Sequence, residues 1–185
     1  MITLRPALKS DEAALGRHGA ALMRQHHASD PRRFILTDRP EAGYGRFLVS
    51  ELDDPDCLVM VAVESDQVVG YVFADVEGTS WRELRGPSGY IHDLYVDEPV
   101  RRRGVGRELM RAAIAWIRSK GMTQVVLSSK SGNESAQRLF AGLGFRRTMV
   151  EMTLDVESPD PETGGNPGSA RASRPTMSDA DGSKG

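Results

Sequence analysis

The chain has 185 residues, of which 39% are hydrophobic and 27% charged, as expected for a soluble globular protein with one core. Its formal net charge of −2 predicts no general attraction to nucleic acid or to a membrane surface. The single cysteine, Cys57, excludes an intrachain disulfide, and no apolar run approaches the roughly 20 residues of a membrane-spanning helix. With no visible signal peptide, we expect a cytoplasmic protein.

Apolar patterns in the first half of the chain predict a short strand, two helices and a hairpin. Alternation of apolar residues indicates strands, and apolar residues three or four positions apart indicate helices. The predicted elements are a strand at 2–5, helices at 10–27 and 40–52, and strands at 58–64 and 68–76.

The second half continues with alternating strands and helices. After a loop at 77–89, the predicted elements are strands at 90–96 and 124–128, a helix at 107–120, a helix at 133–141 and a last strand at 145–154. This order predicts one α/β domain over residues 1–155, with a mixed, mostly antiparallel sheet flanked by helices. Residues 156–185 are rich in Pro, Gly and Ser, and we expect them to form a disordered tail.

The segment from 101 to 107 joins the predicted strand at 90–96 to the predicted helix at 107–120. It has the pattern Arg-x-x-Gly-x-Gly. Free backbone N–H groups and the dipole at a helix N-terminus favour an anion, glycines allow close approach, and arginines bind phosphate oxygens. The pattern therefore favours a pyrophosphate pocket. The alternative is an ordinary tight loop with solvated arginines.

Two motifs in this half resemble those of the GNAT superfamily of acyl-CoA-dependent N-acetyltransferases. Motif A of the family is matched by Arg101-x-x-Gly104-x-Gly106, which follows the strand end Leu94-Tyr95-Val96. Motif B is matched by Asn133-x-x-Ala136-x-x-x-Phe140-x-x-x-Gly144-Phe145. The resemblance implies a three-layer fold in which the fourth and fifth strands, 90–96 and 124–129, splay apart. It also implies acetyl-CoA as the co-substrate, bound between these strands.

The resemblance assigns cofactor binding to residues of both motifs. They are Leu94, Tyr95, Val96, Arg101, Arg102, Arg103, Gly104, Val105, Gly106, Arg107, Asn133, Ala136 and Phe140. The backbone of Leu94 and Val96 would pair with the pantetheine amides, although both residues also suit the core. Asn133 could instead only cap its helix. We expect no metal site, because His26-His27 lacks a set of partner ligands.

His92 and Asp93 are the candidate catalytic residues, because they interrupt an otherwise apolar strand. The strand Tyr90–Val96 resembles the corresponding strand of polyamine and aminoglycoside acetyltransferases. His92 titrates near neutrality and could accept a proton, while Asp93 could bind and orient the ammonium group. Since neighbours on a strand point to opposite faces, we expect different roles for the two. Alternatively, His92 is a half-buried sheet residue and Asp93 pairs with an arginine.

Phe140 departs from the family pattern, in which a tyrosine of motif B protonates the leaving thiolate. Tyr44, Tyr71 or Tyr95 could substitute for it. On the acceptor side, the resemblance points to His26-His27 and to the segments 38–44 and 77–83.

These observations predict transfer of an acetyl group from acetyl-CoA to a primary amine by direct attack in a ternary complex. We expect a small-molecule acceptor that is polyamine-like, amino-acid-like or an aminoglycoside. The alternatives are a protein or peptide N-acetyltransferase and a non-catalytic acyl-CoA-binding regulatory domain. The resemblance also allows a homodimer.

Overall fold

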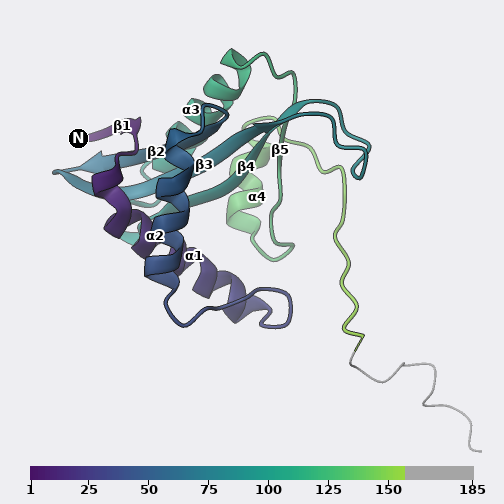
Figure 1. The fold of residues 1–185 in the computed structure, drawn as a ribbon, viewed down its shortest axis with the longest axis horizontal. Coiled ribbons are helices and arrows are strands. Elements are labelled where there is room, and N and C mark those ends of the chain that lie inside the picture. Colours follow the sequence, from purple (N-terminus) through teal and green to yellow (C-terminus); the bar gives the residue numbers. More distant parts are fainter. Residues whose placement is uncertain (157–185) are drawn as a thin grey trace, which may run out of the picture. The chain divides into compact units, whose positions relative to one another are not determined.

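A computed structural model describes residues 1–156, so the predicted tail lies, from residue 157 on, outside the described residues. The chain divides into two units, Met1–Val150 and the segment that begins at Glu151, and the account below concerns the first. The predicted domain boundary at residue 155 stays a prediction. Figure 1 shows the elements, which are β1 (Ile2–Pro6), α1 (Glu12–Ser29), α2 (Pro40–Ser50), β2 (Cys57–Glu64), β3 (Gln67–Glu77), β4 (Ser88–Val96), α3 (Val105–Ser119), β5 (Val125–Leu127) and α4 (Glu134–Ala141).

The five strands form one sheet in the order β1-β2-β3-β4-β5. The first four strands are antiparallel, and β5 is parallel to β4. The parallel pairing joins Gly89, Tyr90 and Ile91 to β5 and goes no further, so β4 continues beyond it. The predicted α/β fold, with a mostly antiparallel sheet and a fourth and fifth strand that part, is confirmed.

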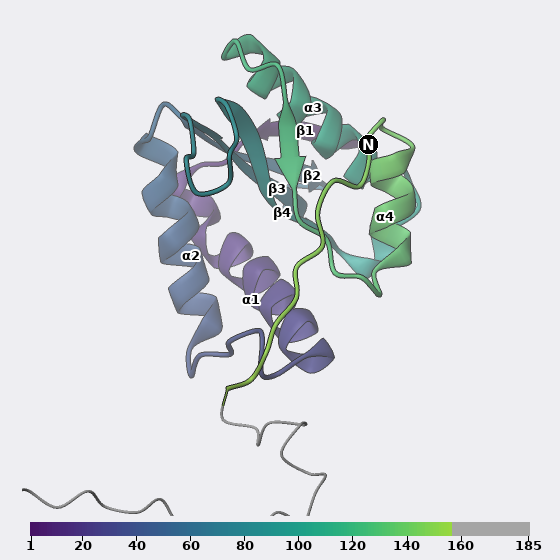
Figure 2. The same ribbon diagram turned by 90° about the vertical axis from the view of Figure 1, so that its right-hand side faces the viewer.

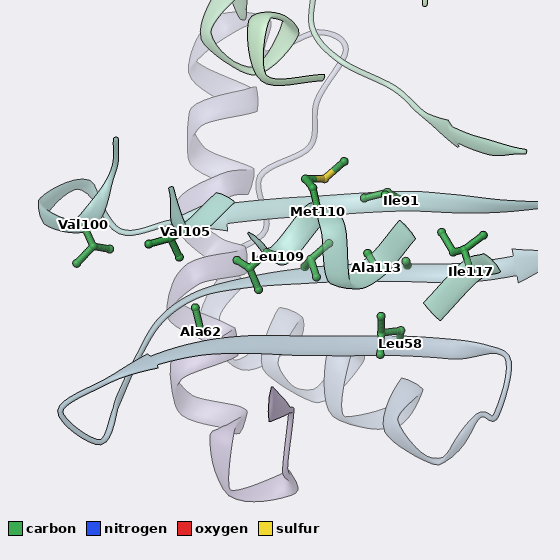
Figure 3. Close-up of a cluster of buried hydrophobic side chains, with 11 residues drawn as sticks. Leu58, Ala62, Ile91, Val100, Val105, Leu109, Met110, Ala113 and Ile117 are labelled. Carbon is green, nitrogen blue, oxygen red and sulfur yellow. The ribbon is translucent and has the colours of Figure 1, made fainter. Parts of the chain in front are cut away.

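Helices cover both faces of this sheet and make three layers (Figure 2). The amphipathic helix α3 buries Leu109, Ala113 and Ile117 against one face, and Figure 3 shows this cluster. Leu15 of α1 and Leu48 of α2 pack against the opposite face. Burial of apolar surface on both faces stabilises the layers and fixes the direction in which each residue of β4 points.

The prediction of a last strand at 145–154 is wrong, because residues 145–156 contain neither helix nor strand. The sequence alternates there as a strand does, but alternation alone does not make a strand, which requires a hydrogen-bonded neighbour. Within residues 1–156, no helix combines the length and the apolar character that crossing a bilayer requires.

Candidate functional site

A β-bulge in β4 brings His92 and Asp93 to the same face of the sheet. Phe73 of β3 pairs with Asp93, whereas the next residue, Ala74, pairs with Ile91, so His92 is the extra residue. The His92 ring stacks on Phe73, with ring centroids 4.9 Å apart, and both His92 and Asp93 line one cleft. The alternation rule predicted opposite faces. That prediction is wrong because the bulge interrupts the alternation.

Asp93 is buried and held by two tyrosines. Its Oδ2 accepts hydrogen bonds from the hydroxyl of Tyr44 on α2 at 2.6 Å and from that of Tyr71 on β3 at 2.9 Å. Burial raises the pKa of Asp93, and the two hydroxyl bonds oppose this effect by stabilising the carboxylate. Asp93 is therefore an anchored carboxyl group, and its partners are tyrosines rather than an arginine.

His92 is paired with a second carboxylate. Its Nε2 lies 2.9 Å from Oδ2 of Asp75, and a third of its side chain is exposed. Burial disfavours the charged imidazole, but the bond and charge of Asp75, helped by Asp93 and Glu77, raise the pKa of His92 above its ordinary value. An imidazole that faces a cleft, and whose pKa a neighbouring carboxylate raises, can exchange a proton with a bound amine.

The cleft next to these residues has a volume of about 500 Å³. Its walls come from α2 and its 3-10 continuation, β3 and β4, and the lining residues are Tyr44, Phe47, Glu51, Phe73, Asp75, His92 and Asp93. The lining thus combines three carboxylates with three aromatic rings and one imidazole. Such a surface suits a cationic, partly apolar molecule.

On the opposite face, the end of β4 approaches the beginning of α3. Leu94 and Val96 pack on the α3 side, whereas Tyr95 lies on the α1 side, where its ring stacks on His18. A Cβ on Gly106 would lie 3.6–3.8 Å from side-chain atoms of Leu139, Val96 and Leu94. The strand end, α3 and α4 therefore converge at Gly106.

The N-terminus of α3 has the geometry of an anion site. Gly104 immediately precedes the helix with a φ of +86°, in the left-handed region that favours glycine, and no side chain caps this end. The first N–H groups of a helix have no partner within the helix. Those of Val105, Gly106 and Arg107 suit phosphate oxygens.

The arginines around this end lie in different environments. Arg103 forms two bonds with the carboxylate of Glu64 on β2, at 2.6 and 3.0 Å. Arg101 donates from Nε to the carbonyl of Val96 at 2.8 Å. Arg102 is exposed and Arg107 half-buried, while the Val105 side chain belongs to the core.

The motif B residues lie on α4 and next to its two ends. Asn133 caps this helix, since its Oδ1 accepts from the backbone N–H of Ala136 at 3.2 Å. Phe140 packs edge-on against Phe145, with ring centroids 6.0 Å apart. Of the tyrosines considered as substitutes for an acid at position 140, Tyr44 and Tyr71 both bond Asp93.

Sequence reasoning missed Glu51 and Asp75 as members of the site. Asp75 is a single carboxylate at the end of an apolar run in β3, and this interruption could have identified it. Of the residues expected on the acceptor side, Tyr44 lines the cleft, whereas Glu77 and Glu83 pair with Arg85.

Cys57 is a poor nucleophile, because burial and nearby carboxylates raise the pKa of its thiol to about 12. Within the described residues, no group of His, Cys, Asp and Glu is arranged to hold a metal ion.

Comparison with known proteins relates the chain to acetyltransferases. The sequence model of the acetyltransferase (GNAT) family matches residues 21–145. Mycothiol acetyltransferase of Thermobispora bispora is 35% identical over 96 residues, which cover 50% of this chain and 31% of that protein. N-alpha-acetyltransferase 30 of Xenopus laevis is 27% identical over 156 residues, covering 76% of this chain and 55% of that protein.

Solved structures share the fold. A tetramutant of the BH1408 protein of Bacillus halodurans superposes with a TM-score of 0.73 at 22% identity, covering 83% of this chain and 99% of that one. The chain spans less than half the length of the first curated relatives that it matches.

Proposed function

Because the chain belongs to the GNAT acetyltransferase family, we propose that it transfers an acetyl group from acetyl-CoA to a primary amine of a small molecule, by direct attack in a ternary complex. The observation that carries this proposal is the bulge in β4. It turns His92 and Asp93 into a cleft on one face, while Leu94 and Val96 line the other face beside the N-terminus of α3.

Binding of acetyl-CoA is supported on the α3 side. The uncapped end of α3 would hold the pyrophosphate through backbone N–H groups, with charge from Arg102 and Arg107. The backbone of β4 from Leu94 to Val96 lies beyond its pairing with β5, so this edge can bond the pantetheine amides. In this proposal Tyr95 contributes only its backbone, and Val105 and Arg103 support the loop before α3. Asn133, Ala136 and Phe140, on α4 or at its start, border the place proposed for the pantetheine.

The amine is handled on the cleft side. Acetyl-CoA supplies a thioester carbonyl and a thiolate leaving group. Asp93 orients the ammonium form of the acceptor, and His92 accepts its proton so that the nitrogen lone pair is free. The new C–N bond replaces the C–S bond, with a backbone N–H near Leu94 as the proposed donor to the oxyanion. As the amide forms, the nitrogen loses its second proton to solvent. Phe140 has no proton to give, so CoA departs as the thiolate, which a thiol pKa near ~8.5 allows.

The test is free-thiol release from acetyl-CoA with a panel of polyamines, amino acids, aminoglycosides and short peptides. We expect release with one class of small amine, and a loss of about 100-fold or more in kcat for His92→Gln with acetyl-CoA binding retained. His27→Gln is the matched control. Although the resemblance points to His27 on the acceptor side, it lies on α1, is not among the residues that line the cleft and bonds the carbonyl of Phe34.

Other outcomes would contradict the proposal. Release with peptides alone would indicate a protein acetyltransferase. Tight acetyl-CoA binding without release by any amine would favour a non-catalytic acyl-CoA-binding domain, the reading that Phe140 motivates. If the chain did not bind CoA, both parts of the proposal would be refuted, the cofactor site at α3 and the acetyl transfer at the cleft. A cytoplasmic location and a homodimer stay predictions.

A further inference from the structure

We infer that the acceptor carries a second cationic group besides the amine that is acetylated, and that Glu51 and Asp75 hold this second group. The inference rests on the proposed function, because it names the substrate class of the same cleft. Two kinds of molecule share this chemistry: linear di- or polyamines, and amino sugars with several ammonium groups.

The first argument is the charge of the cleft. Three of its seven lining residues, Glu51, Asp75 and Asp93, are carboxylic acids, and no lysine or arginine belongs to the described lining. His92 is the one lining group that can become positive, and it is paired with Asp75. The lining therefore has more carboxylates than one ammonium group can compensate, and a second cation on the acceptor would balance them.

The second argument is the placement of these carboxylates along α2. Tyr44, Phe47 and Glu51 are spaced by three and seven positions, so they share one face of α2 and its 3-10 continuation. Seven residues at about 1.5 Å each separate Tyr44 from Glu51 by roughly 10 Å along the axis. Asp93 is bonded to Tyr44 at one end of this face, and Glu51 lies at the other, next to the negative end of the α2 dipole. The cleft thus offers two separate places for positive charge.

The third argument is an unsatisfied acceptor. Oδ2 of Asp75 is bonded to His92, but its buried Oδ1 has no hydrogen-bond partner among the described residues. Buried carboxylate oxygens normally have a donor. Because Asp75 lines the cleft, an ammonium group of the acceptor is a donor that this carboxylate can take up. The rings of Phe47 and Phe73, whose centroids are 5.6 Å apart, provide aromatic surface for the chain that joins the two cations.

The same features discriminate against amino acids. An α-carboxylate beside the reacting amine would face Glu51, Asp75 and Asp93 without a basic partner in the lining. Like charges brought together in a partly desolvated cleft reduce affinity strongly. We therefore expect the cleft to prefer a diamine over the amino acid of the same length.

The experiment compares cadaverine, pentylamine and lysine, with spermidine and kanamycin as further acceptors. Pentylamine is cadaverine without the second amine, and lysine is cadaverine with an added carboxylate. We expect kcat/KM for cadaverine to exceed that for pentylamine and for lysine by about tenfold or more, which corresponds to about 1.4 kcal/mol. A higher value with spermidine would identify a linear polyamine, and a higher value with kanamycin an amino sugar.

Glu51→Gln should reduce the ratio of cadaverine to pentylamine towards one. Asp53→Asn is the matched control, since Asp53 lies two residues away, is exposed and pairs with Lys9 outside the cleft, so it should keep the wild-type ratio. Calorimetric binding of the three compounds to the wild-type chain with CoA separates this inference from the proposed function. Preferential binding of cadaverine without thiol release would refute the activity and support the dication site. Equal kcat/KM and equal affinity for cadaverine and pentylamine, or a preference for lysine, would overturn the inference.

Discussion

Replacing Tyr71 with phenylalanine removes one hydroxyl group and keeps the ring. Tyr71 is fully buried, with 0% of its surface exposed, and its hydroxyl donates to Oδ2 of Asp93 at 2.9 Å. It is not among the residues that line the cleft. Tyr71→Phe therefore changes the surroundings of Asp93 without removing a group that the acceptor would touch.

The expected magnitude follows from the energy of this hydrogen bond. Burial raises the pKa of Asp93, and the bonds from Tyr44 and Tyr71 act against burial because they stabilise the carboxylate. A hydrogen bond to a charged group contributes about 1.5–3 kcal/mol, and about 1.4 kcal/mol corresponds to one pH unit. Loss of the Tyr71 bond should therefore raise the pKa of Asp93 further. Two groups contribute to the acidic limb of the activity profile, because His92 must be neutral to accept a proton and Asp93 must be ionised to orient the ammonium. The contribution of Asp93 moves to higher pH by about one to two pH units, which steepens the limb.

The assay is kcat/KM for thiol release as a function of pH, with thermal denaturation as a check on folding. Tyr90→Phe is the matched control, because the Tyr90 hydroxyl bonds Oγ of Ser128 at 2.6 Å instead of Asp93. We expect its profile to coincide with that of the wild-type chain. A folded Tyr71→Phe variant whose acidic limb neither moves nor becomes steeper would contradict a requirement for ionised Asp93 beside neutral His92.

Two further predictions concern glycines. A Cβ on Gly89 would lie 2.3 Å from the buried side chain of Ile117. Gly89→Ala should therefore lower the free energy of unfolding, measured by urea denaturation, by about 1–3 kcal/mol. Gly78→Ala is the control, because a Cβ there would meet no atom within 4 Å and should leave the free energy of unfolding unchanged. Gly104 and Gly121 have φ angles of +86° and +81°, so alanine at either should lower stability by about 1–2 kcal/mol. Only Gly104→Ala should weaken acetyl-CoA binding, by about tenfold in calorimetry, and equal weakening by Gly121→Ala would refute the proposed pyrophosphate site.

The helices and the order of the strands follow from local patterns in the sequence. The helix predicted at 107–120 is found at Val105–Ser119, because apolar residues recur on one face of it and the sheet buries that face. The segment 145–154 shows the limit of this reasoning. Apolar residues alternate with polar ones at 150–154, but no strand forms there, since pairing depends on a neighbour that a local pattern does not specify.

The candidate site was predictable in part. His92 and Asp93 stand out as polar residues in an apolar strand, but their common face depends on the register between β3 and β4. The contacts of Tyr44 and Tyr71 with Asp93 join residues 49 and 22 positions apart. Such contacts arise from the packing of α2 and from strand register, and neither is encoded in a short stretch of sequence.

The bulge in β4 determines which face of the sheet each group serves. Strict alternation from Ile91 would direct Asp93 to the α3 side, among apolar core residues and away from the hydroxyls of Tyr44 and Tyr71. A carboxylate there would cost several kcal/mol or take up a proton. With the extra residue, Asp93 meets both hydroxyls and Leu94 returns to the α3 side. The pairing of β4 with β5 also ends at Ile91, immediately before the bulge. The acceptor groups and the open strand edge thus arise at the same point of one strand, and deletion of His92 would remove the imidazole and turn Asp93 away from its partners.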